Sequence, residues 1–500
     1  MAGCPMHHGM AKASGCTHVA VSTFSKLFPR ATGVAVSEQE AAVIGGPGGL
    51  MHDFDGASKD STIPAGYIFF AQFVDHDVTL DSVSDLRGSP LPASEINELP
   101  NIRSVSLDLD CVYGFGPEAS PHIFDGARPG RLAVNSNGYD LARSPSGTAL
   151  IGDPRNDENL FVSQLQLLFH RFHNKIYNER VYHREQSRPF NRFEEAQLQC
   201  RYHYQWLVLF DFLKRLCDPD VYRFAAKKII DTSDKTFPYF YKPNEQGKLT
   251  MPVEFSVAAY RVGHVMVRSE YAVNADNTDV ELFDDRFATL GFSPVPEDLI
   301  VGWRYLLPVD ERIQPRMSKG IDPLLADELQ TLPVVPSKRP NDKALAFRNI
   351  LRGNVMSLPS GQAIARELHG RGYPGVDPDF DLRLNDPDRP AGNLTTVNAW
   401  RELDRLADGR SPLRDNTPLF YYILRESQVK HDSQRLGPVG SAILMEVFGG
   451  MLKYCGTSFV HHDWVPDPNV AKETHIDHNK LIEGTNYYPF DLADVVRFLQ

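Results

Sequence analysis

Three consecutive ionisable residues, Asp75, His76 and Asp77, come shortly after the apolar and aromatic run Tyr67–Phe70. Buried segments rarely contain consecutive ionisable groups unless a metal, a cofactor or an ion pair compensates for them. If the segment is helical, the three side chains point about 100° apart and cannot all serve one site. Gln72 and His76 are four residues apart and share one helix face. We therefore expect Gln72 and His76 to face one site and Asp77 another; the alternative is a capping cluster around a hydrogen-bonded histidine.

A second group of oxygen-bearing side chains lies between residues 104 and 110. Ser104, Ser106, Asp108 and Asp110 alternate with apolar residues and fall on one side of the segment if it is extended. Calcium takes roughly six to eight oxygen ligands, so the pattern suits a calcium site to which Asp77 adds a carboxylate. An amphipathic edge segment with a solvated face explains this stretch equally well when it is considered alone.

Two further motifs place charged residues at predicted helices. Arg155 and Glu158 are three residues apart where the clearest predicted helix begins, which fits either a cofactor cleft or a helix cap with a surface ion pair. His264 lies among small apolar residues, with Gly263 leaving space beside it and Arg261 one turn earlier. A histidine in such surroundings is usually a core residue, but these neighbours favour a haem axial ligand.

Apolar periodicity predicts the helices that must position these residues. The segment Asn159–Tyr182 is the clearest, with apolar residues at three- and four-residue spacing. The same criterion predicts helices over residues 192–215, 253–267, 344–351, 418–427 and 439–457. Strand signals are weak, and residues 84–150 and 365–400 have the composition of loops. The prediction is a mainly α-helical fold, a single large domain with long loops and little β-structure.

Composition and charge limit the classes of function. The chain has 500 residues, of which 42% are hydrophobic and 23% charged, as in ordinary soluble globular proteins. Its net charge of −12 argues against a nucleic-acid surface or an anionic-membrane partner. No uninterrupted apolar run approaches the roughly 18 residues that span a bilayer.

The ends of the chain and its cysteines suggest a domain boundary and a compartment. Residues 1–25 contain Cys and His but have no basic start and no apolar core, so we predict a flexible tail rather than a secretory signal. Residues 26–500 would then form the catalytic domain, with Leu332–Pro340 as either an internal boundary or a connection within one domain. Six cysteines are too few for a disulfide framework in a chain of this length. A cytoplasmic location is predicted, with secretion that needs no signal peptide as the alternative.

Together these motifs resemble those of the animal-type haem peroxidases of the peroxidase–cyclooxygenase superfamily, particularly its bacterial members. The order of the motifs is the family's order. They are Gln72-x-x-Asp75-His76-Asp77, Leu107–Gly114, Gly152-Asp153-x-Arg155-x-x-Glu158 with His173-Asn174, Tyr260-Arg261-x-Gly263-His264, Arg348–Gly353 with Leu358–Gly361, and Arg435–Val439. Each motif alone is weak, so the resemblance rests on their common order over roughly residues 40 to 500.

The resemblance implies a haem b cofactor that is held from one side by His264. This residue would be the proximal ligand to the iron, and Asn349 would accept a hydrogen bond from its other ring nitrogen. Arg261 and Arg352 would pair with the haem propionates. Asp75 and Glu158 match the carboxylates that form ester links to haem in the mammalian enzymes, so at least partial covalent attachment is expected.

On the other side of the haem, the resemblance implies a site for hydrogen peroxide. His76 would move a proton between the two peroxide oxygens, and Arg155 would stabilise the negative charge that grows as the O–O bond breaks. Gln72 would orient a distal water or a small anionic substrate. The expected activity is reduction of H₂O₂ to give a ferryl intermediate, which then oxidises small organic donors, halide or thiocyanate.

The resemblance also implies a calcium site. The matching residues are Asp77, Ser104, Ser106, Asp108 and Asp110, where Asp110 stands in place of the commoner Ser. The added charge should strengthen the binding of the cation.

Two other functions fit the same superfamily. Its fatty-acid dioxygenases need a radical-forming tyrosine three residues before the proximal histidine, where this chain has Arg261 and places Tyr260 one position earlier. A non-catalytic haem-binding adhesion or sensor module would have no need to retain the histidines and the arginine. His170 and His173 share a helix face and are interpreted as packing residues. The sequence predicts neither the oligomeric state nor the physiological electron donor.

Overall fold

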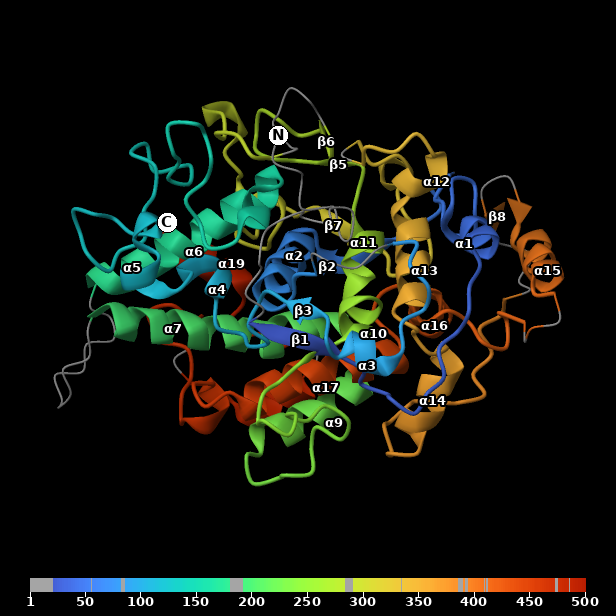
Figure 1. The fold of residues 1–500 in the computed structure, drawn as a ribbon. Coiled ribbons are helices and arrows are strands. Elements are labelled where there is room, and N and C mark those ends of the chain that lie inside the picture. Colours follow the sequence, from blue (N-terminus) through green and yellow to red (C-terminus); the bar gives the residue numbers. More distant parts are fainter. Residues whose placement is uncertain are drawn as a thin grey trace.

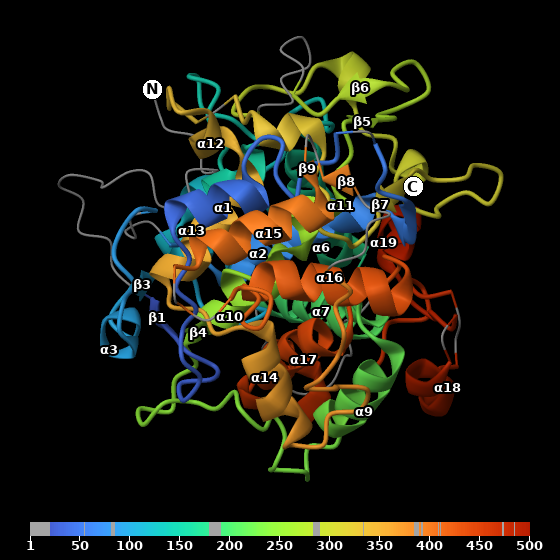
Figure 2. The same cartoon turned by 90° about the vertical axis from the view of Figure 1, so that its right-hand side faces the viewer.

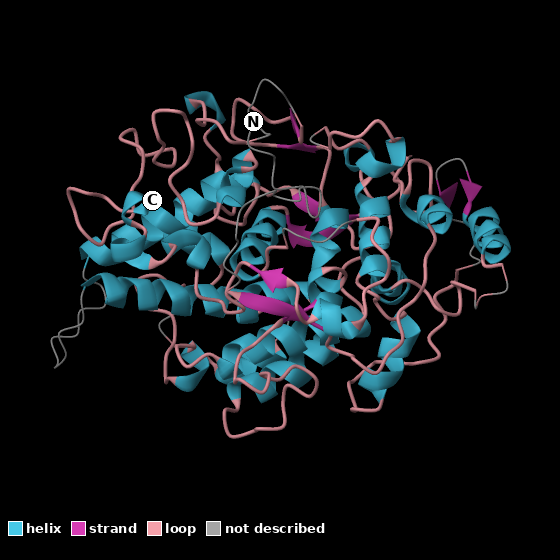
Figure 3. Cartoon of the chain, viewed as in Figure 1, coloured by secondary structure: helices cyan, strands magenta, loops and turns pink. Residues whose placement is uncertain are grey.

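The computed structural model is mainly helical. It describes residues 21–54, 56–81, 86–179, 192–283, 291–333, 335–384, 390–391, 394–408, 410, 412–472, 475–484 and 486–500. About 46% of the chain is helix, and the strands are short and scattered (Figure 3). The predicted fold class is therefore confirmed. Most of the predicted N-terminal tail, residues 1–20, lies outside the described residues.

Helices of eight or more residues form the body of the molecule. They are α1 (Glu38–Gly45), α2 (Gly66–Val78), α6 (Leu160–Glu179), α7 (Arg192–Trp206), α9 (Pro219–Ile230), α13 (Leu345–Val355), α14 (Gly361–His369), α15 (Thr396–Leu406), α16 (Leu419–His431), α17 (Pro438–Tyr454) and α19 (Leu492–Leu499). Shorter α-helices connect them: α3 (Ala93–Ile96), α4 (Asp110–Tyr113), α5 (Gly116–Ala119), α8 (Leu213–Leu216), α10 (Val253–Ser256), α11 (Gly263–Met266), α12 (Pro340–Lys343) and α18 (His478–Glu483).

Single turns of other helix types and short strands complete the described structure. The π-helical segment is η3 (Leu207–Phe212), and the 3₁₀ turns are η1 (Pro121–Ile123), η2 (Pro154–Asp157), η4 (Ala259–Val262), η6 (Glu297–Leu299), η7 (Trp303–Tyr305), η8 (Asp327–Gln330) and η9 (Phe459–His461). The strands are β1 (Ser22–Ser25), β2 (Asp60–Pro64), β3 (Pro100–Asn101), β4 (Met251–Pro252), β5 (Glu270–Tyr271), β6 (Val280–Glu281), β7 (Met317–Lys319), β8 (Pro390–Ala391) and β9 (Leu394–Thr395). Strand β1 pairs antiparallel with β3 and parallel with β4; β2–β7, β5–β6 and β8–β9 form two-stranded pairs.

Helix α2 lies near the centre of the molecule in both views of the fold and packs against α6 and α11 (Figures 1 and 2). Its aromatic residues explain this position, because Phe70 and Phe73 are completely buried and Phe73 stacks on Phe169 of α6 at 4.8 Å between ring centroids. Every residue of α2 is buried except Gln72 and Asp75. A central helix with only two partly exposed residues therefore carries the ionisable triplet.

The strongly periodic helices appear close to their predicted bounds. The segment predicted over Asn159–Tyr182 is α6, Leu160–Glu179, and residues 180–182 lie outside the described residues. The helix predicted over residues 192–215 runs through α7, η3 and α8 to Leu216. In contrast, the prediction of one continuous helix over residues 253–267 is wrong. Ala258 leaves the helical conformation at φ −129° and ψ −73°, which separates α10 from η4 and α11.

One hydrophobic core contains buried residues from Phe24 to Val496. The segment Leu332–Pro340 belongs to this core at Leu332 and Val335, which are buried, so it is not an exposed linker. Among the helices of the described ranges, none is long and apolar enough to cross a membrane.

The Arg435–Val439 motif, at the turn between α16 and α17, contacts a buried acid of α16, Glu426. The Glu426 carboxylate accepts a hydrogen bond from the Val439 N–H at 3.0 Å. A Cβ atom at Gly437 would lie 2.3 Å from the same carboxylate, so the close approach requires glycine. Burial raises the pKa of Glu426 from 4.5 to about 8.

We expect Glu426→Gln to remove part of the pH dependence of stability. The folded-state pKa lies above the unfolded one, so the folded protein binds more protons between about pH 4.5 and 8, and its stability falls as pH rises through that window. The slope is at most roughly 1.4 kcal/mol per pH unit for one group. Glutamine keeps an acceptor for Val439 but does not titrate. Denaturant unfolding at about pH 5, 7 and 9 should show the variant gaining relative to the wild type as pH rises; a constant difference would contradict this account.

Candidate functional site

A cavity of about 1490 Å³, with its open mouth included, lies among α2, η4, α11 and α13. Its walls are mostly aliphatic and aromatic, and a small set of ionisable and amide side chains faces into it. These polar residues are Gln72, Asp75, His76, Asp81, Glu158, Asn159, Arg261, His264 and Arg352. The structure thus brings together side chains from four separate motifs of the sequence.

The three consecutive ionisable residues of α2 face two different sites. His76, like Gln72 and Asp75, lines the cavity. Asp77 is completely buried on a different face, where it lies among the carboxylates of Asp108 and Asp110. The 100° step of the helix separates neighbouring residues in this way, as the spacing predicts.

His76 is held in a neutral form at the cavity wall. Its Nδ1 lies 2.7 Å from Oδ1 of Asn156, and its Nε2 lies 3.5 Å from Oε1 of Glu158. Burial, together with the nearby Arg155 guanidinium, lowers the pKa of His76 to about 3. A neutral imidazole at this position can accept a proton.

Arg155 lies directly behind His76 and is only 1% exposed. Its Nη2 donates to the backbone carbonyl of His76 at 3.1 Å and to Asp153 at 2.7 Å. Within the described part of the chain, Nη1 of Arg155 is buried without a hydrogen-bond partner. An unsatisfied buried donor is costly, so this atom marks a place where an acceptor from a bound molecule would be favoured.

Glu158 and Gln72 form a second polar wall of the cavity. Gln72 Nε2 donates to Glu158 Oε1 at 2.5 Å, and Asn159 donates to Gln72 Oε1 at 3.1 Å. Glu158 Oε2 is buried and has no hydrogen-bond partner among the described residues. Burial raises the pKa of Glu158 to about 8 and that of Asp75 to about 6, since neither carboxylate is well solvated here.

His264 faces the cavity from α11, and Asn349 of α13 contacts it as expected. The direction of the hydrogen bond differs from the prediction, because Asn349 Nδ2 lies 2.9 Å from His264 Nδ1 while Asn349 Oδ1 accepts from Arg261 Nη1 at 2.7 Å. A guanidinium can only donate, so it takes the amide oxygen and turns the amide nitrogen to the histidine. The prediction that Asn349 accepts from His264 is therefore wrong in this structure.

Positive charge gathers at the same end of the cavity. Burial, with the neighbouring Arg352 and Arg348, lowers the pKa of Arg261 to about 10. The hydrogen bonds of the Arg261 side chain go to two neutral groups, the carbonyl of Ser256 and Asn349. Arg352 is paired with Asp81 at 2.6 Å. A buried arginine without a paired carboxylate favours the binding of an anion beside it.

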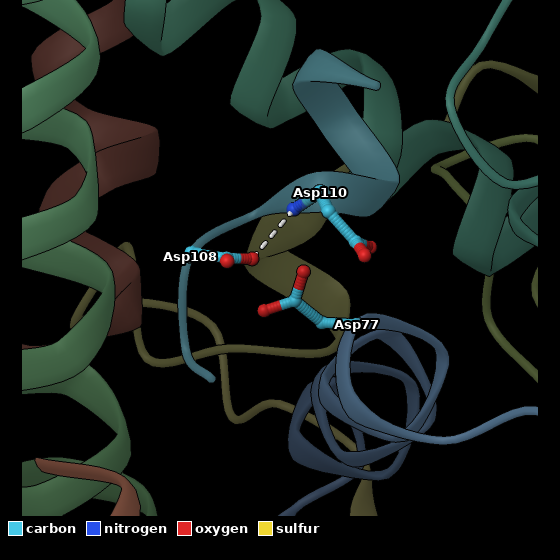
Figure 4. A group of neighbouring side chains, drawn as sticks. All are labelled: Asp77, Asp108 and Asp110. Atoms are coloured by element: carbon cyan, nitrogen blue, oxygen red, sulfur yellow. Dashed lines mark hydrogen bonds between the residues drawn. The ribbon is translucent and has the colours of Figure 1, made fainter. Parts of the chain in front are cut away.

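Three carboxylates cluster on the far side of α2 (Figure 4). Ligand oxygens of Asp77, Asp108 and Asp110 lie within 4.8 Å of one another. Burial raises the pKa values of all three groups, to about 6 for Asp110, and the neighbouring carboxylates add to this effect at Asp77 and Asp110. Such a group is unfavourable without a compensating cation, and oxygen ligands suit calcium.

The loop that supplies two of these carboxylates differs from the predicted extended segment. Leu109 adopts a left-handed conformation at φ 59°, and Asp110 begins helix α4. Ser104 donates to Asp108 at 3.0 Å and stays within the cluster, but the Ser106 hydroxyl donates to Cys455 at 3.4 Å. The turn at Leu109 breaks the alternation, so the side chains do not share one face. The expectation of one row of four oxygens is therefore wrong.

Ion pairs that we did not predict connect the carboxylate cluster to the cavity. Arg103 pairs with Asp110 at 3.1 Å and with Asp153 at 2.8 Å. Asp153 also pairs with Arg155, and these two arginines hold the pKa of Asp153 well below its usual range. The sequence indicated Asp153 only as a helix start. Its position two residues before Arg155 was the signal for an ion pair.

Comparison with known proteins matches part of the chain to one family model and relates the fold to solved structures. Residues 89–291 match the family model described as animal haem peroxidase. No curated protein matches this chain. Solved structures with a similar fold include peroxidase A from Dictyostelium discoideum, at 14% identity and TM-score 0.56 over 96% of this chain and 93% of that one. They also include a fatty acid alpha-dioxygenase from Oryza sativa, at 15% identity and TM-score 0.55 over 93% of this chain and 76% of that one. A fatty acid alpha-dioxygenase from Arabidopsis thaliana has 14% identity and TM-score 0.58 over 95% of this chain and 76% of that one.

Residues 89–291 therefore resemble an animal haem peroxidase domain, and the chain has the fold seen in peroxidase A and in the fatty acid alpha-dioxygenases. Animal haem peroxidases bind haem, and the cavity fits that cofactor. Apolar walls surround the space, and a Cβ atom added at Gly263 beside His264 would meet nothing within 4 Å. The half-buried Arg261 lines the cavity and forms no ion pair with a carboxylate of the described residues. A flat apolar macrocycle with two carboxylates matches these features.

Proposed function

We propose that this protein is a haem peroxidase that uses H₂O₂ to oxidise small organic donors, halide or thiocyanate. One observation carries the proposal: a neutral histidine, His76, lines the same cavity as His264, and Arg155, which has an unsatisfied donor, lies directly behind His76. The proposed catalytic domain is residues 26–500, supported by the main hydrophobic core, which has buried residues from Phe24 to Val496.

The proposed roles follow from the contacts of each side chain. His264 would hold the iron through Nε2, which requires the ring proton on Nδ1, so the Asn349 amide would turn its oxygen to Nδ1 when haem binds. Arg261 and Arg352 would pair with the propionates. When bound, the haem supplies the two-electron chemistry of peroxide reduction. His76 Nε2 accepts the proton of one peroxide oxygen and delivers it to the other, which leaves as water.

Two further side chains would assist this proton transfer. Arg155 Nη1 donates to the leaving oxygen as its negative charge develops. Gln72, held by Glu158 and Asn159, presents a fixed amide that orients a water or a small anion.

Steady-state turnover tests the proposed activity. Bromide, iodide, thiocyanate and a phenolic donor would each be supplied with H₂O₂ to the haem-loaded protein. We expect peroxide-dependent oxidation of at least one donor, and the pattern of donors would identify the substrate class. Failure to oxidise any of them, with haem fully bound, would favour a non-catalytic haem-binding module.

A fatty-acid dioxygenase is the second candidate, because the apolar cavity and two of the similar structures favour it. Tyr260 lines the cavity, but its hydroxyl donates to the carbonyl of Ala71 at 3.2 Å and its ring stacks on Phe255. Arg261 occupies the position three residues before His264. Oxygen uptake with linoleate and trace peroxide should therefore be negligible, and rapid uptake would support the dioxygenase.

Covalent haem attachment is expected at two carboxylates. Asp75 and Glu158 both line the cavity, and Glu158 has an unengaged oxygen. We predict that part of the haem stays with the protein after extraction into acidified organic solvent, and that the double variant Asp75→Asn, Glu158→Gln releases all of it. Complete extraction from the wild type would contradict the ester links. Haem-stained denaturing gels provide an independent measurement.

We also propose that calcium binds at Asp77, Asp108 and Asp110, with Ser104 beside them and Ser106 able to join only if its side chain turns from Cys455. Chelation should lower the melting temperature of the wild type, because a ligand that binds only the folded state stabilises it. Asp77→Asn should abolish this response.

The same variant tests whether the cation site supports catalysis. Asp77 is adjacent to His76, so Asp77→Asn should lower kcat/KM for H₂O₂ roughly tenfold while haem remains bound, as losses of outer-shell groups do. Asp310→Asn, which changes a half-buried aspartate that pairs with Arg312 outside the carboxylate cluster, is the control and should change neither property. A calcium response that survives in Asp77→Asn would contradict the assignment.

A further inference from the structure

We infer that a hydrogen-bonded chain behind His76 fixes the tautomer of this histidine, with the proton on Nδ1 and the lone pair on Nε2. The chain consists of Asn156, Gln166 and His170. Its effect on catalysis rests on the proposed peroxidase function, but the tautomer itself is a property of the folded protein. All three are positioning residues, since they act on peroxide only through His76.

The contacts form a continuous path from the cavity wall into the protein. Asn156 Oδ1 lies 2.7 Å from His76 Nδ1, and Asn156 Nδ2 donates to Gln166 Oε1 at 2.7 Å. Gln166 Nε2 lies 2.9 Å from His170 Nε2, and His170 Nδ1 lies 3.1 Å from the carbonyl of Ala133. Asn156, Gln166 and His170 are 0% exposed, so water does not compete for these bonds.

The direction of the bonds follows from a carbonyl near the middle of the path. Gln166 Nε2 also donates to the backbone carbonyl of Cys111 at 3.2 Å, and a carbonyl can only accept. The amide nitrogen of Gln166 must therefore face this side, and its oxygen must face Asn156. That oxygen requires a donor, so the nitrogen of Asn156 faces Gln166 and the oxygen of Asn156 faces His76. His76 must then carry its proton on Nδ1.

The far end of the path gives the same answer independently. The carbonyl of Ala133 requires a donor, so His170 carries its proton on Nδ1 and accepts from Gln166 through Nε2. Reversing any one amide would set two donors or two acceptors against each other inside the core. A buried polar group left without its partner costs roughly 1 to 3 kcal/mol, and each amide in the path would add to this cost. The arrangement is therefore strongly favoured over its reverse.

Two of the three residues in the path, Gln166 and His170, belong to helix α6. Gln166 and His170 are four residues apart and so lie on one face, below η2 and its Asn156. The interpretation of His170 as a packing residue is therefore incomplete. His76 gains an Nε2 lone pair directed at the cavity, which is the atom that a proton acceptor needs.

His173 provides a matched control on the same helix. It is as fully buried as His170, but its Nε2 lies 2.9 Å from the carbonyl of Gly130 and its Nδ1 lies 3.1 Å from the hydroxyl of Tyr113. These contacts place its proton on Nε2, the opposite tautomer, and they do not include His76. His173→Phe should therefore leave the ring of His76 unchanged.

Nitrogen NMR of histidine-labelled, haem-loaded protein in the diamagnetic ferrous carbon monoxide form tests the inference. The signals of His76 are assigned by their loss in His76→Gln. In the wild type we expect a protonated Nδ1 and an unprotonated Nε2. Asn156→Leu and the isosteric Gln166→Met should each produce a mixture of tautomers, whereas His173→Phe should retain the wild-type pattern.

The second measurement is the bimolecular rate constant for reaction with H₂O₂. We expect it to fall about tenfold or more in Asn156→Leu and several-fold in Gln166→Met, at unchanged haem content. Unchanged His76 signals in both variants, or Nε2 protonation in the wild type, would overturn the inference even if the protein is a peroxidase. The expected tautomer in a protein that fails to react with peroxide would leave the inference standing and refute the proposed function.

Discussion

Replacing His264 with alanine is expected to abolish stable haem binding while the protein remains folded. His264 is half-buried at the cavity wall and would provide the only bond to the iron from its side. Asn349 and Arg261 would retain their mutual hydrogen bond, so little of the core is lost. Titration of the variant with haem, followed by absorption and by thermal unfolding, measures both parts of this expectation.

Rescue and a control make this result specific. Exogenous imidazole should restore haem binding to His264→Ala, because the space beside Gly263 is open and the cavity would admit the free ring. His369→Ala changes a surface histidine on α14 that does not line the cavity, and it should bind haem like the wild type. Wild-type affinity in His264→Ala without imidazole would show that another residue holds the iron.

Replacing His76 with alanine should have the second largest effect, and this effect is on the rate of reaction with H₂O₂ and not on haem binding. Loss of a general acid–base group typically costs a factor of about 10² to 10⁴, so we expect kcat/KM for H₂O₂ to fall by that amount. Haem content should not change, since the proposed bond to the iron comes from His264 and not from His76. Stopped-flow mixing with peroxide and steady-state turnover would be compared at equal haem occupancy.

The contrast with a neighbouring residue shows whether the loss is catalytic. Gln72→Ala removes another polar side chain from the same face of α2, and it should reduce the rate with peroxide far less than His76→Ala does. Equal losses in the two variants would indicate a general disturbance of α2. A loss of less than about threefold in His76→Ala would exclude it as the acid–base group, because that is far below the usual contribution.

Local patterns predicted the helices whose faces differ strongly in polarity. Helix α6 was predictable because its apolar residues recur at the helical period and pack on the core. The segment over residues 253–267 was not, since its apolar residues surround the chain and show no preferred face. There the stacking of Tyr260 on Phe255 accompanies a break at Ala258 that no local pattern indicates.

The candidate site, like the fold, could be predicted from the sequence only in part. The residue types at Asp75, His76 and Asp77, with the turn of a helix, already separate a cavity group from a cation group. The order of the motifs also indicated that Arg155 and His264 belong with His76. The structure places His76 and His264 at one cavity with Arg155 directly behind His76, while their roles stay predictions.

The amino-acid sequence by itself therefore determined the class of fold, the candidate ligands and the separation of the two sites on α2. The tertiary structure alone decided the hydrogen-bond directions: Asn349 turns its nitrogen to His264 because Arg261 takes the oxygen, and Ser106 turns to Cys455. It also brought Asn156 and Gln166 to His76. The physical reason is that a buried donor or acceptor takes its direction from every partner that meets it, and those partners come from segments far apart in the chain.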